Sequence, residues 1–551
     1  MDRDAPAGPA KPVRSQIPEG GVEAVQGGGD RVLVLSPGVT LTLGQDALLM
    51  SGQLATKSSR SCIPCAGISG ASGTPGSIPY YNILWAEIAG DHRWLVIDYA
   101  GQTSAQSLEV RSAKFAIPEL VAEQTPAGVG DQVAPWVDRL LDRVYDGSAR
   151  RKRAWVLVNP HAGPGGAEKI WEKEVKPIFE AARMPITVVR TAYSGEAVTL
   201  ARDLNIEDYD IAIPCSGDGL PHEVFNGLAK RPDARRALSK IAVCHIPCGS
   251  GNAMSCNLYG TYRPALAALA IVKGVPTPLD LVSVTHGGQR TISFLSQAVG
   301  LIAEIDLGTE SMRWMGATRF TVGFLMRAVQ KKTYPCDIAV KVEISHKDDV
   351  KKHYRQQVAQ REVRASKKAD QPPNDVDKQS EVSPLAPSAV SDDDGLGLPP
   401  LKYGTAVDKL PEGWELIPHE KLGSFYCGNM AYMAPDANFF PAALSNDGLM
   451  DLITNDGDIP LFKSIGMQLG VESGDFFDNP LVSYRKISAY RIIPRNQETG
   501  YISIDGEAID FGPFQAEIHQ GLGMTLSKKG IFEAPGPLNW DTETTNERLL
   551  A

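Results

Sequence analysis

The 551-residue sequence predicts an α/β domain followed by a β-rich domain, with a smaller β-rich module in front of them. From Arg153 to about residue 275, short aliphatic runs alternate with amphipathic segments of helical spacing. This alternation is typical of βαβ units built around a parallel sheet. Residues 31–120 and the chain after residue 276 show strand patterns instead, with alternating polarity and Gly turns.

The ends and connections of these units follow from composition. Residues 1–30 are rich in Gly, Ala and Pro, which predicts disorder. Residues 31–120 form the β-rich module, and residues 121–150 form a linker with a helix at 134–148, "APWVDRLLDRVYDGS". The α/β domain then occupies 151–275.

The β-rich domain is predicted to be discontinuous. Its strands occupy 276–345 and 403–530, and residues 531–551 are an irregular tail. The interruption at 346–402 is highly charged and then rich in Pro, Ser and Asp. This composition predicts a disordered insertion with a helical start, either a carrier of phosphorylation sites or a tolerated surface loop.

Charge and hydropathy exclude several classes of protein. The chain is 43% hydrophobic and 22% charged, as in ordinary globular proteins, and its formal net charge is −10. A general nucleic-acid binder would carry a basic surplus. We find no signal-peptide core and no run of 18 apolar residues. The expected location is the cytoplasm, with peripheral association with intracellular membranes or the plasma membrane.

Three Gly-bearing loops follow predicted strands of the α/β domain. They are "NPHAGPGGA" (159–167), "SGDG" (216–219) and "PCGSGNA" (247–253). Ligands bind at the carboxyl ends of strands in an open parallel sheet. Glycine lets the backbone approach a phosphate, and a helix N-terminus supplies N–H donors. The first loop is neither a Walker A motif nor a good dinucleotide fingerprint. Together the loops indicate a phosphate-binding site.

These loops, with "SGDGLPHEVFNGL" (216–228) and "IDGE" (504–507), closely resemble the diacylglycerol-kinase-type catalytic domain. The serine that opens SGDG, and the stretch 299–323, resemble sphingosine (sphingoid long-chain base) kinases. "IPYYNILWAEI" (78–88) is similar to fungal and plant members. The resemblance covers roughly 150–345 and 403–530. It implies a Rossmann-like α/β catalytic domain, an antiparallel β sandwich, ATP with Mg2+, and phosphorylation of the primary hydroxyl of a sphingoid base.

Asp218 is the expected catalytic base. Phosphoryl transfer to an alcohol needs a base within hydrogen-bond reach of the hydroxyl. Gly217 and Gly219 leave room for substrate and nucleotide around this carboxylate, and the resemblance places Ser216 through Gly219 in the substrate site. The alternative is that Asp218 only caps the helix that follows it.

The remaining nucleotide contacts are implied by the resemblance. Glu223, one turn into the helix, matches an ATP-contacting acid, although a solvated glutamate is the alternative. Asp505, Gly506 and Glu507 match a motif near the phosphates or Mg2+-bound water, although a plain hairpin turn is the alternative. His222 is expected to be structural. The other expected ATP-binding residues are Asn159, Pro160, His161, Thr191, Ala192, Tyr193, Ser194, Gly195, Gly249, Ser250, Gly251, Arg313 and Arg319.

Substrate selection is expected to depend on Asp306. By resemblance it reads the amine of the sphingoid base, which diacylglycerol lacks. Glu304 would point to the opposite face of a strand. Five residues are candidates either for a lipid-tail pocket or for core packing: Leu301, Ile302, Phe320, Phe324 and Leu325. Cys62 and Cys65 are either palmitoylation sites or unmodified surface thiols.

Three other functions stay open at this point. A diacylglycerol or ceramide kinase would share the fold, and an inactive lipid-binding regulator would share the pocket. A membrane-recruited scaffold would depend on the N-terminal module and the insertion.

Overall fold

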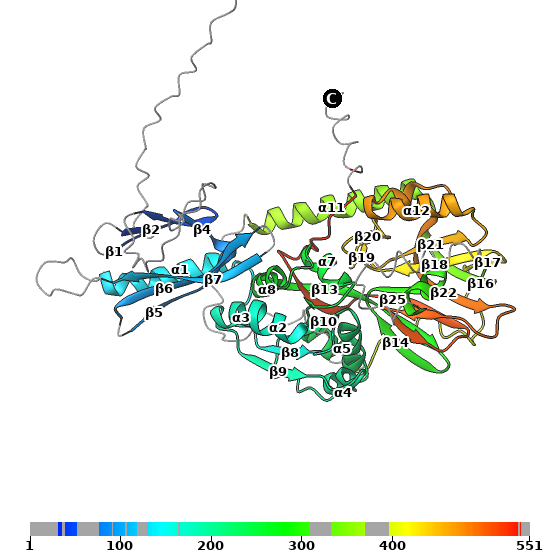
Figure 1. Cartoon of the computed structure of the whole chain (residues 1–551), viewed down its shortest axis with the longest axis horizontal. Helices are drawn as coiled ribbons and strands as arrows, with labels where there is room; N and C mark the ends of the chain where they lie inside the picture. Colours follow the sequence, from blue (N-terminus) through cyan, green and yellow to red (C-terminus); the bar gives the residue numbers. More distant parts are fainter. Residues whose placement is uncertain are drawn as a thin grey trace, which may run out of the picture.

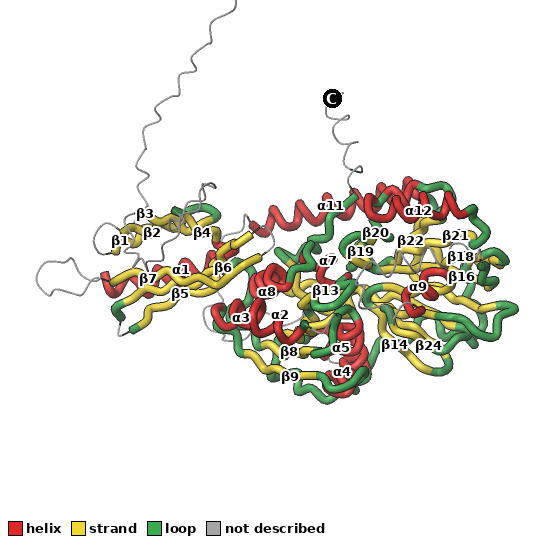
Figure 2. Tube along the Cα trace, viewed as in Figure 1, coloured by secondary structure: helices red, strands yellow, loops and turns green. Residues whose placement is uncertain are grey.

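The computed structural model describes residues 31–35, 39–51, 76–90, 92–104, 107–117, 129–163, 166–308, 332–369, 396–537 and 540. The N-terminal module, the α/β domain and the β-rich domain follow one another along the longest axis (Figure 1). Helices concentrate in the α/β domain and strands in the β-rich domain (Figure 2). The sequence predicts this order of units.

The N-terminal module holds two small antiparallel sheets and one helix. The first sheet has the order β1 (Val32–Leu35), β2 (Val39–Leu43), β3 (Ala47–Ser51), β4 (Ser77–Pro79). The second has the order β5 (Ile83–Ala89), β6 (Trp94–Ser104), β7 (Ser107–Ala116). Helix α1 (Val129–Val144) starts earlier than the predicted connecting helix. It buries Val133, Trp136 and Leu140 in a core that continues into the α/β domain.

The α/β domain contains a parallel sheet, as predicted. The strands are β8 (Ala154–Val158), β9 (Ile186–Arg190), β10 (Ile211–Ser216), β11 (Ala242–Val243) and β12 (Ile246–Pro247). β8 lies between β9 and β10, and β10 also pairs with β11 and β12, always in parallel. The helices are α2 (Ala167–Ile170), α3 (Lys176–Ala181), α4 (Glu196–Arg202), α5 (Gly219–Ala229), α6 (Ala234–Lys240), α7 (Ala253–Tyr259) and α8 (Pro264–Lys273).

The β-rich domain is organised as one 11-stranded antiparallel sheet. Its strands are β13 (Val275–His286), β14 (Gln289–Ser293), β15 (Ser296–Gly300), β16 (Cys336–Ile344), β17 (Glu415–His419), β18 (Leu422–Gly428), β21 (Met450–Asp456), β22 (Ser483–Pro494), β23 (Ile502–Ile504), β24 (Glu507–Ile509) and β25 (Phe514–Ser527). Val284 near one end of the strand order and Ile504 near the other share one core, so the sheet curls over on itself.

A two-stranded ribbon joins the two large domains. β13 and β25 pair along almost their whole length, from Val275 opposite Ser527 to His286 opposite Phe514. The hydroxyl of Thr525 donates a hydrogen bond to the carbonyl of Val243 on β11 (2.7 Å). The ribbon therefore continues from the curled sheet to the edge of the parallel sheet.

Helices α9 (Leu301–Gly308), α11 (Lys347–Ala369) and α12 (Leu461–Ser473) pack on the β-rich domain, and α9 corrects the sequence analysis. Residues 301–308 form helix α9, whereas the sequence analysis places Glu304 and Asp306 on a strand. Gly300, with φ at +85°, lets the chain leave β15 and enter this helix directly. Helix α12 (Leu461–Ser473) and a small ribbon of β19 (Tyr432–Ala434) and β20 (Ala437–Asn438) lie nearby.

The start and end of the predicted insertion are ordered parts of the domain. Helix α11 (Lys347–Ala369) buries Val350 and stacks Tyr354 edge-on against Trp540. At the other end, the backbone amides of Lys402 and Tyr403 donate to the carboxylate of Glu517 (2.9 and 3.0 Å). Helix α11 agrees with the helical start predicted for the insertion. The predicted disorder is wrong for residues 396–402, whose backbone is held by contacts such as those to Glu517.

Candidate active site

The three Gly-bearing loops meet at the carboxyl ends of β8, β10 and β12. β9 and β10 lie on opposite sides of β8, so the connections from β8 and β9 lead to opposite sides of the sheet. Such a topological switch point is where open α/β sheets bind ligands. The loop after β9, residues 191–195, lies at the same edge of the sheet. The tertiary structure thus brings together four segments that the sequence separates by up to 90 residues.

Glycines allow the loops to pack backbone against backbone. A Cβ on Gly249 would collide with the Cα of Gly217, so the second and third loops touch at these residues. A Cβ on Gly163 would lie 2.5 Å from the carbonyl oxygen of Cys248, so the first loop touches the third. Three of the motif glycines are therefore required for contact between the loops, in addition to any contact with phosphate.

Asp218 holds the N-terminus of a different helix from the one it precedes. The backbone N–H groups of Ala253 and Met254 donate to its two carboxylate oxygens (3.0 and 2.9 Å). Its side chain makes no capping bond to α5. Gly251 lies so close that a Cβ there would be 3.1 Å from Oδ2. The carboxylate remains partly exposed and keeps lone pairs for a further donor.

The third loop depends on Asn252, which the sequence analysis did not select. Its Oδ1 accepts from the N–H of Gly249 and its Nδ2 donates to the carbonyl of Gly249, both at 2.8 Å. Asn252 adopts a left-handed conformation with φ at +56°. Asparagine adopts this conformation more readily than most residues, so the asparagine at the end of "GSGN" was a recognisable sign of a left-handed turn.

Glu223 organises the loop that precedes α4. Its carboxylate accepts from the N–H groups of Gly195 and Ala197, each at 3.0 Å. It therefore supplies the N-terminal acceptors of a neighbouring helix, and it is more than a solvated glutamate. Thr191 in this loop is buried, whereas the residues from Ala192 to Gly195 are exposed at the edge of the sheet.

The first loop is closed by its own asparagine. Oδ1 of Asn159 accepts from the N–H of His161 (3.0 Å), and its carbonyl accepts from the N–H of Ala162 (3.0 Å). Pro160 follows directly, and the side chain of His161 is exposed. The tight turn presents the start of the loop at the same edge as Ser250, which is half-buried.

Asp505 is enclosed by protein donors. It accepts from Nδ1 of His222 (2.8 Å), from the hydroxyl of Ser293 (2.5 Å), and from the backbone N–H groups of Phe294, Leu295 and Ser296 (2.9–3.1 Å). The side chain has no exposed surface. Asp505 therefore ties α5 to the turn between β14 and β15. Because no oxygen of this carboxylate is exposed, the structure does not support the expected contact between Asp505 and phosphates.

His222 is structural, as expected. Burial alone would lower the pKa of His222, but the hydrogen bond and charge of Asp505 outweigh it and leave the pKa above its usual value. Nδ2 of Asn226, one turn further along α5, donates to the backbone carbonyls of His222 and Ile292 (2.9 and 2.8 Å). The histidine thus contributes to the contact between the domains.

Glu507 reaches the Asp218 loop from the other domain. Asp505 and Gly506 form the tight turn between β23 and β24, both with positive φ, so the hairpin expected as an alternative does occur. The turn directs the exposed Glu507 toward Gly219 at the start of α5. A Cβ on Gly219 would lie 2.8 Å from Oε1 of Glu507. Two carboxylates from different domains therefore flank Gly219.

Asp306 lies on the other side of the same hairpin. Its Oδ2 accepts from the hydroxyl of Ser503 on β23 (2.7 Å) and lies 3.8 Å from where a Cβ on Gly506 would be. Glu304 instead is buried and forms an ion pair with Lys332. Residues i and i+2 of a helix also point in different directions, so the two acids remain separated on α9. The choice of Asp306 over Glu304 as the acid that binds the amine stays a prediction.

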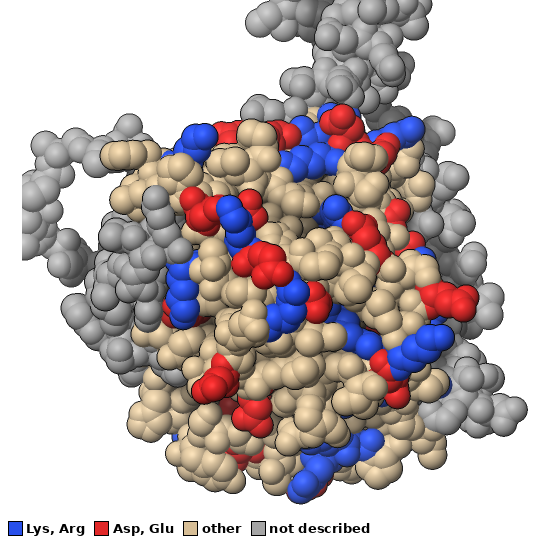
Figure 3. Space-filling model, turned by 90° about the vertical axis from the view of Figure 1, so that its right-hand side faces the viewer, with Lys and Arg blue, Asp and Glu red and all other residues tan. Residues whose placement is uncertain are grey.

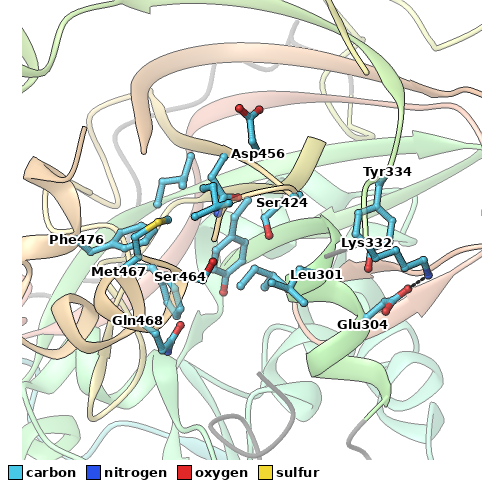
Figure 4. A pocket seen from close by; sticks show the side chains of 18 residues that line it. Leu301, Glu304, Lys332, Tyr334, Ser424, Asp456, Ser464, Met467, Gln468 and Phe476 are labelled. Carbon is cyan, nitrogen blue, oxygen red and sulfur yellow. Dashed lines mark hydrogen bonds and ion pairs between the residues drawn. The ribbon is translucent and has the colours of Figure 1, made fainter. Parts of the chain in front are cut away.

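A cavity opens beside α9. It has a volume of about 790 Å³ including its mouth, and its lining is mostly apolar. Figure 4 shows Leu301 between the ion pair of Glu304 and Lys332 on one side and Met467, Phe476 and Gln468 on the other. Leu301 and Ile302 line it, whereas Tyr426, Phe439, Met467 and Phe476 had no recognisable signal in the sequence. They come from separate elements that only the fold brings together.

Several expected residues lie outside the residues that the structure describes. They are Arg313, Arg319, Phe320, Phe324, Leu325, Cys62 and Cys65, together with residues 1–30, 370–395 and 541–551. Their predicted roles stay predictions. Within the described residues, no helix is both long and apolar enough to cross a membrane.

Comparisons with known proteins identify related chains. Residues 153–284 match the diacylglycerol kinase catalytic domain, and residues 31–146 match a domain of unknown function. A chain from Bacillus anthracis str. Sterne described as a diacylglycerol kinase aligns with 69% of this chain and 98% of its own, at 18% identity and a TM-score of 0.41.

Two fungal relatives cover most of the chain. Sphingoid long chain base kinase 5 of Saccharomyces cerevisiae is 37% identical over 432 residues, or 72% of this chain and 62% of the relative. The chain thus spans less than two thirds of that relative. Sphingoid long chain base kinase 4 of Schizosaccharomyces pombe is 33% identical over 460 residues, or 83% of this chain and 89% of the relative. The chain therefore belongs to the family of sphingoid long chain base kinases.

Proposed function

We propose that the protein transfers the γ-phosphate of ATP to the primary hydroxyl of a sphingoid long-chain base. One observation carries the proposal: a single hairpin, β23–β24, joins three acids and the cavity. Its Glu507 lies against Gly219, next to Asp218, and its Ser503 and Gly506 lie against Asp306. The apolar cavity begins on α9, the helix that carries Asp306. A substrate with a polar head and a long alkyl chain matches this spatial order of acidic groups followed by an apolar cavity. A diacylglycerol has the chain but no cation for Asp306.

In this proposal Asp218 acts as the general base. The substrate hydroxyl donates to a carboxylate oxygen, its oxygen attacks the γ-phosphorus, the proton passes to Asp218, and ADP leaves with the electrons of the broken bond. The two N–H groups of α7 hold the carboxylate in one orientation. The base is therefore positioned before the substrate arrives, which lowers the entropic cost of the reaction.

The loops at the sheet edge would hold the nucleotide. The turn at Asn159 through His161, the exposed residues from Ala192 to Gly195, and the loop of Gly249 through Gly251 offer backbone N–H groups at one edge. Glu223 would act through the loop it holds. Arg313 and Arg319 are proposed to contact phosphate, as the family resemblance implies.

Magnesium would accompany the nucleotide. Oxygen ligands suit this ion, and it commonly binds through one or two carboxylates together with substrate phosphates. Glu507 is the exposed carboxylate beside the Asp218 loop and fits this role or the binding of a Mg2+-bound water. Asp505 is excluded as a direct ligand in this arrangement because protein donors occupy both of its oxygens.

The substrate head would sit at Asp306. A cationic amine that leaves water needs a counter-charge, and the half-buried carboxylate provides one. The alkyl chain would extend past Leu301 and Ile302 into the cavity. The bond from Ser503 orients the carboxylate toward the hairpin.

The test is phosphate transfer from labelled ATP with Mg2+, using sphingosine, phytosphingosine, ceramide and diacylglycerol in mixed micelles. We expect product from the sphingoid bases. Asp218→Asn should lower kcat by about 100-fold or more because it removes the base. Asp306→Asn should erode the preference for free amines over ceramide.

The control is Asp146→Asn, at an exposed acid that follows helix α1 of the N-terminal module, which should retain wild-type rates. Product from diacylglycerol alone would contradict the proposed substrate. ATP binding without any product would favour a regulator.

A further inference from the structure

Helix α12 separates the cavity from solvent. Its inner side buries Met467 and Val471, and its residues Ser464, Met467 and Gln468 line the cavity. Figure 4 shows these three side chains on one side of the opening. The same helix therefore has an outer face that lies directly over the proposed path of the alkyl chain.

The outer face is apolar and exposed. Phe462 is 87% exposed and Leu469 is 76% exposed, the largest values for an aromatic and for a leucine among the described residues. Their spacing of seven residues places them on one side of the helix, with Gly466 between them. Charged residues occur only at the flanks of this face, as Lys463 and Glu472. Water contact with side chains of this size is unfavourable.

We propose that the outer face of α12 docks on a lipid bilayer, with Phe462 and Leu469 inserted among the acyl chains. The inference rests on the proposed function, because a sphingoid base partitions into membranes and must leave one to be phosphorylated. Docking places the wall of the tail cavity against the bilayer. The substrate can then pass from lipid to cavity without exposing its chain to water.

A bilayer fits this face better than a second protein copy does. A stable protein interface buries about 800 Å² on each partner around a packed core. Two side chains separated by a glycine do not form such a core, but they suffice as shallow anchors of an interfacial helix. Lys463 can extend its charged end to the lipid headgroups beside Phe462.

The charge distribution also indicates apolar insertion. On the face in Figure 3, which shows the end of the molecule formed by the β-rich domain, basic and acidic side chains are interspersed. A surface that binds membranes by charge alone carries a cluster of lysines and arginines. Binding through α12 should therefore persist in vesicles without anionic lipid.

The experiment is co-sedimentation of the full chain with phosphatidylcholine vesicles. We expect Phe462→Ser with Leu469→Ser to lower the vesicle partition coefficient about tenfold or more, because two exposed apolar groups are lost. The matched control is Val407→Ser with Leu416→Ser, at positions 92% and 55% exposed elsewhere. It should bind as the wild type does. Melting temperatures should not change, since none of these side chains is in a core.

Activity provides a second measurement. With a short-chain, water-soluble base the α12 double variant should keep the wild-type kcat/KM. With the same base class presented in vesicles, its kcat/KM should fall about tenfold while the control variant stays unchanged.

Three outcomes would overturn the docking: wild-type chain that does not sediment with vesicles, an α12 variant that binds like the wild type, or a wild-type dimer that the variant converts to monomer. Vesicle binding that depends on Phe462 and Leu469, without phosphorylation of any base, would overturn the proposed function and still support the docking.

Discussion

At the scale of single residues, the site uses acids chiefly to hold backbone. Asp218, Glu223 and Asp505 each accept from at least two backbone N–H groups of another segment. A carboxylate that accepts several such bonds forms stronger bonds than a neutral acceptor. The motif acids therefore position the loops, and Asp218 is also partly exposed.

The pair of His222 and Asp505 predicts a specific pH dependence. The folded-state pKa of His222 lies above its usual 6.5. The pair therefore contributes its full stabilisation below about pH 6.5, and this contribution is lost as pH rises through the folded-state pKa. Thermal unfolding measured across pH should show that His222→Gln lowers the free energy of unfolding most at low pH, by about 1–3 kcal/mol. The exposed His92→Gln is the control. A constant difference at all pH values would contradict the assignment.

At the scale of elements, the three loops act as one packed unit. Each meets its neighbour through glycine, so the position of one loop determines the position of the next. Ordinary loops tolerate substitution because they touch little. These loops resemble a core in this respect, although they lie at the edge of the sheet.

This packing predicts unequal effects of adding a methyl group. Gly249→Ala should cost about 1–3 kcal/mol because its Cβ would collide with Gly217. It should also raise KM for ATP, since the second and third loops must separate. Gly512→Ala, where a Cβ would meet nothing within 4 Å, should change neither property. Chemical denaturation and ATP-dependent kinetics measure both. Equal stability of the two variants would show that the loops can move apart freely.

At the scale of the whole molecule, two buried asparagines join the large domains. Asn226 on α5 accepts from the N–H of Ile292 and donates to its carbonyl (2.9 and 2.8 Å). Asn257 on α7 pairs in the same way with Tyr432 (3.0 and 2.7 Å). Each amide completes the hydrogen bonds of a backbone unit in the β-rich domain, so both domains hold the active-site helices.

These two contacts predict coupled unfolding. Asn226→Ala and Asn257→Ala should each cost about 1–3 kcal/mol, because a buried N–H and C=O lose their partner. Each should also raise KM for ATP through looser placement of α5 or α7. Asn205→Ala, at an exposed turn, is the control. Denaturant titration should show one transition in the wild type and two in the double variant. A single transition with unchanged midpoint in the double variant would mean that other contacts couple the domains.

The sequence by itself determined the order of the units, the parallel sheet and the three loops, because periodicity and glycine placement are local properties. Motif resemblance also selected Asp218, Asp306 and Glu507 as candidate site residues, whose roles stay predictions. The sequence analysis was wrong about the strand at Glu304 and Asp306, because a short segment with two acids among apolar residues fits either period.

Only the tertiary structure decided which acids are enclosed and which are accessible. Asp505 and Glu507 are two residues apart, yet one is surrounded by donors more than 200 residues away in sequence and the other is exposed. The cavity and the two asparagine contacts likewise join residues from distant elements. Contacts between segments distant in sequence leave no periodicity in either segment, so a single sequence does not reveal them.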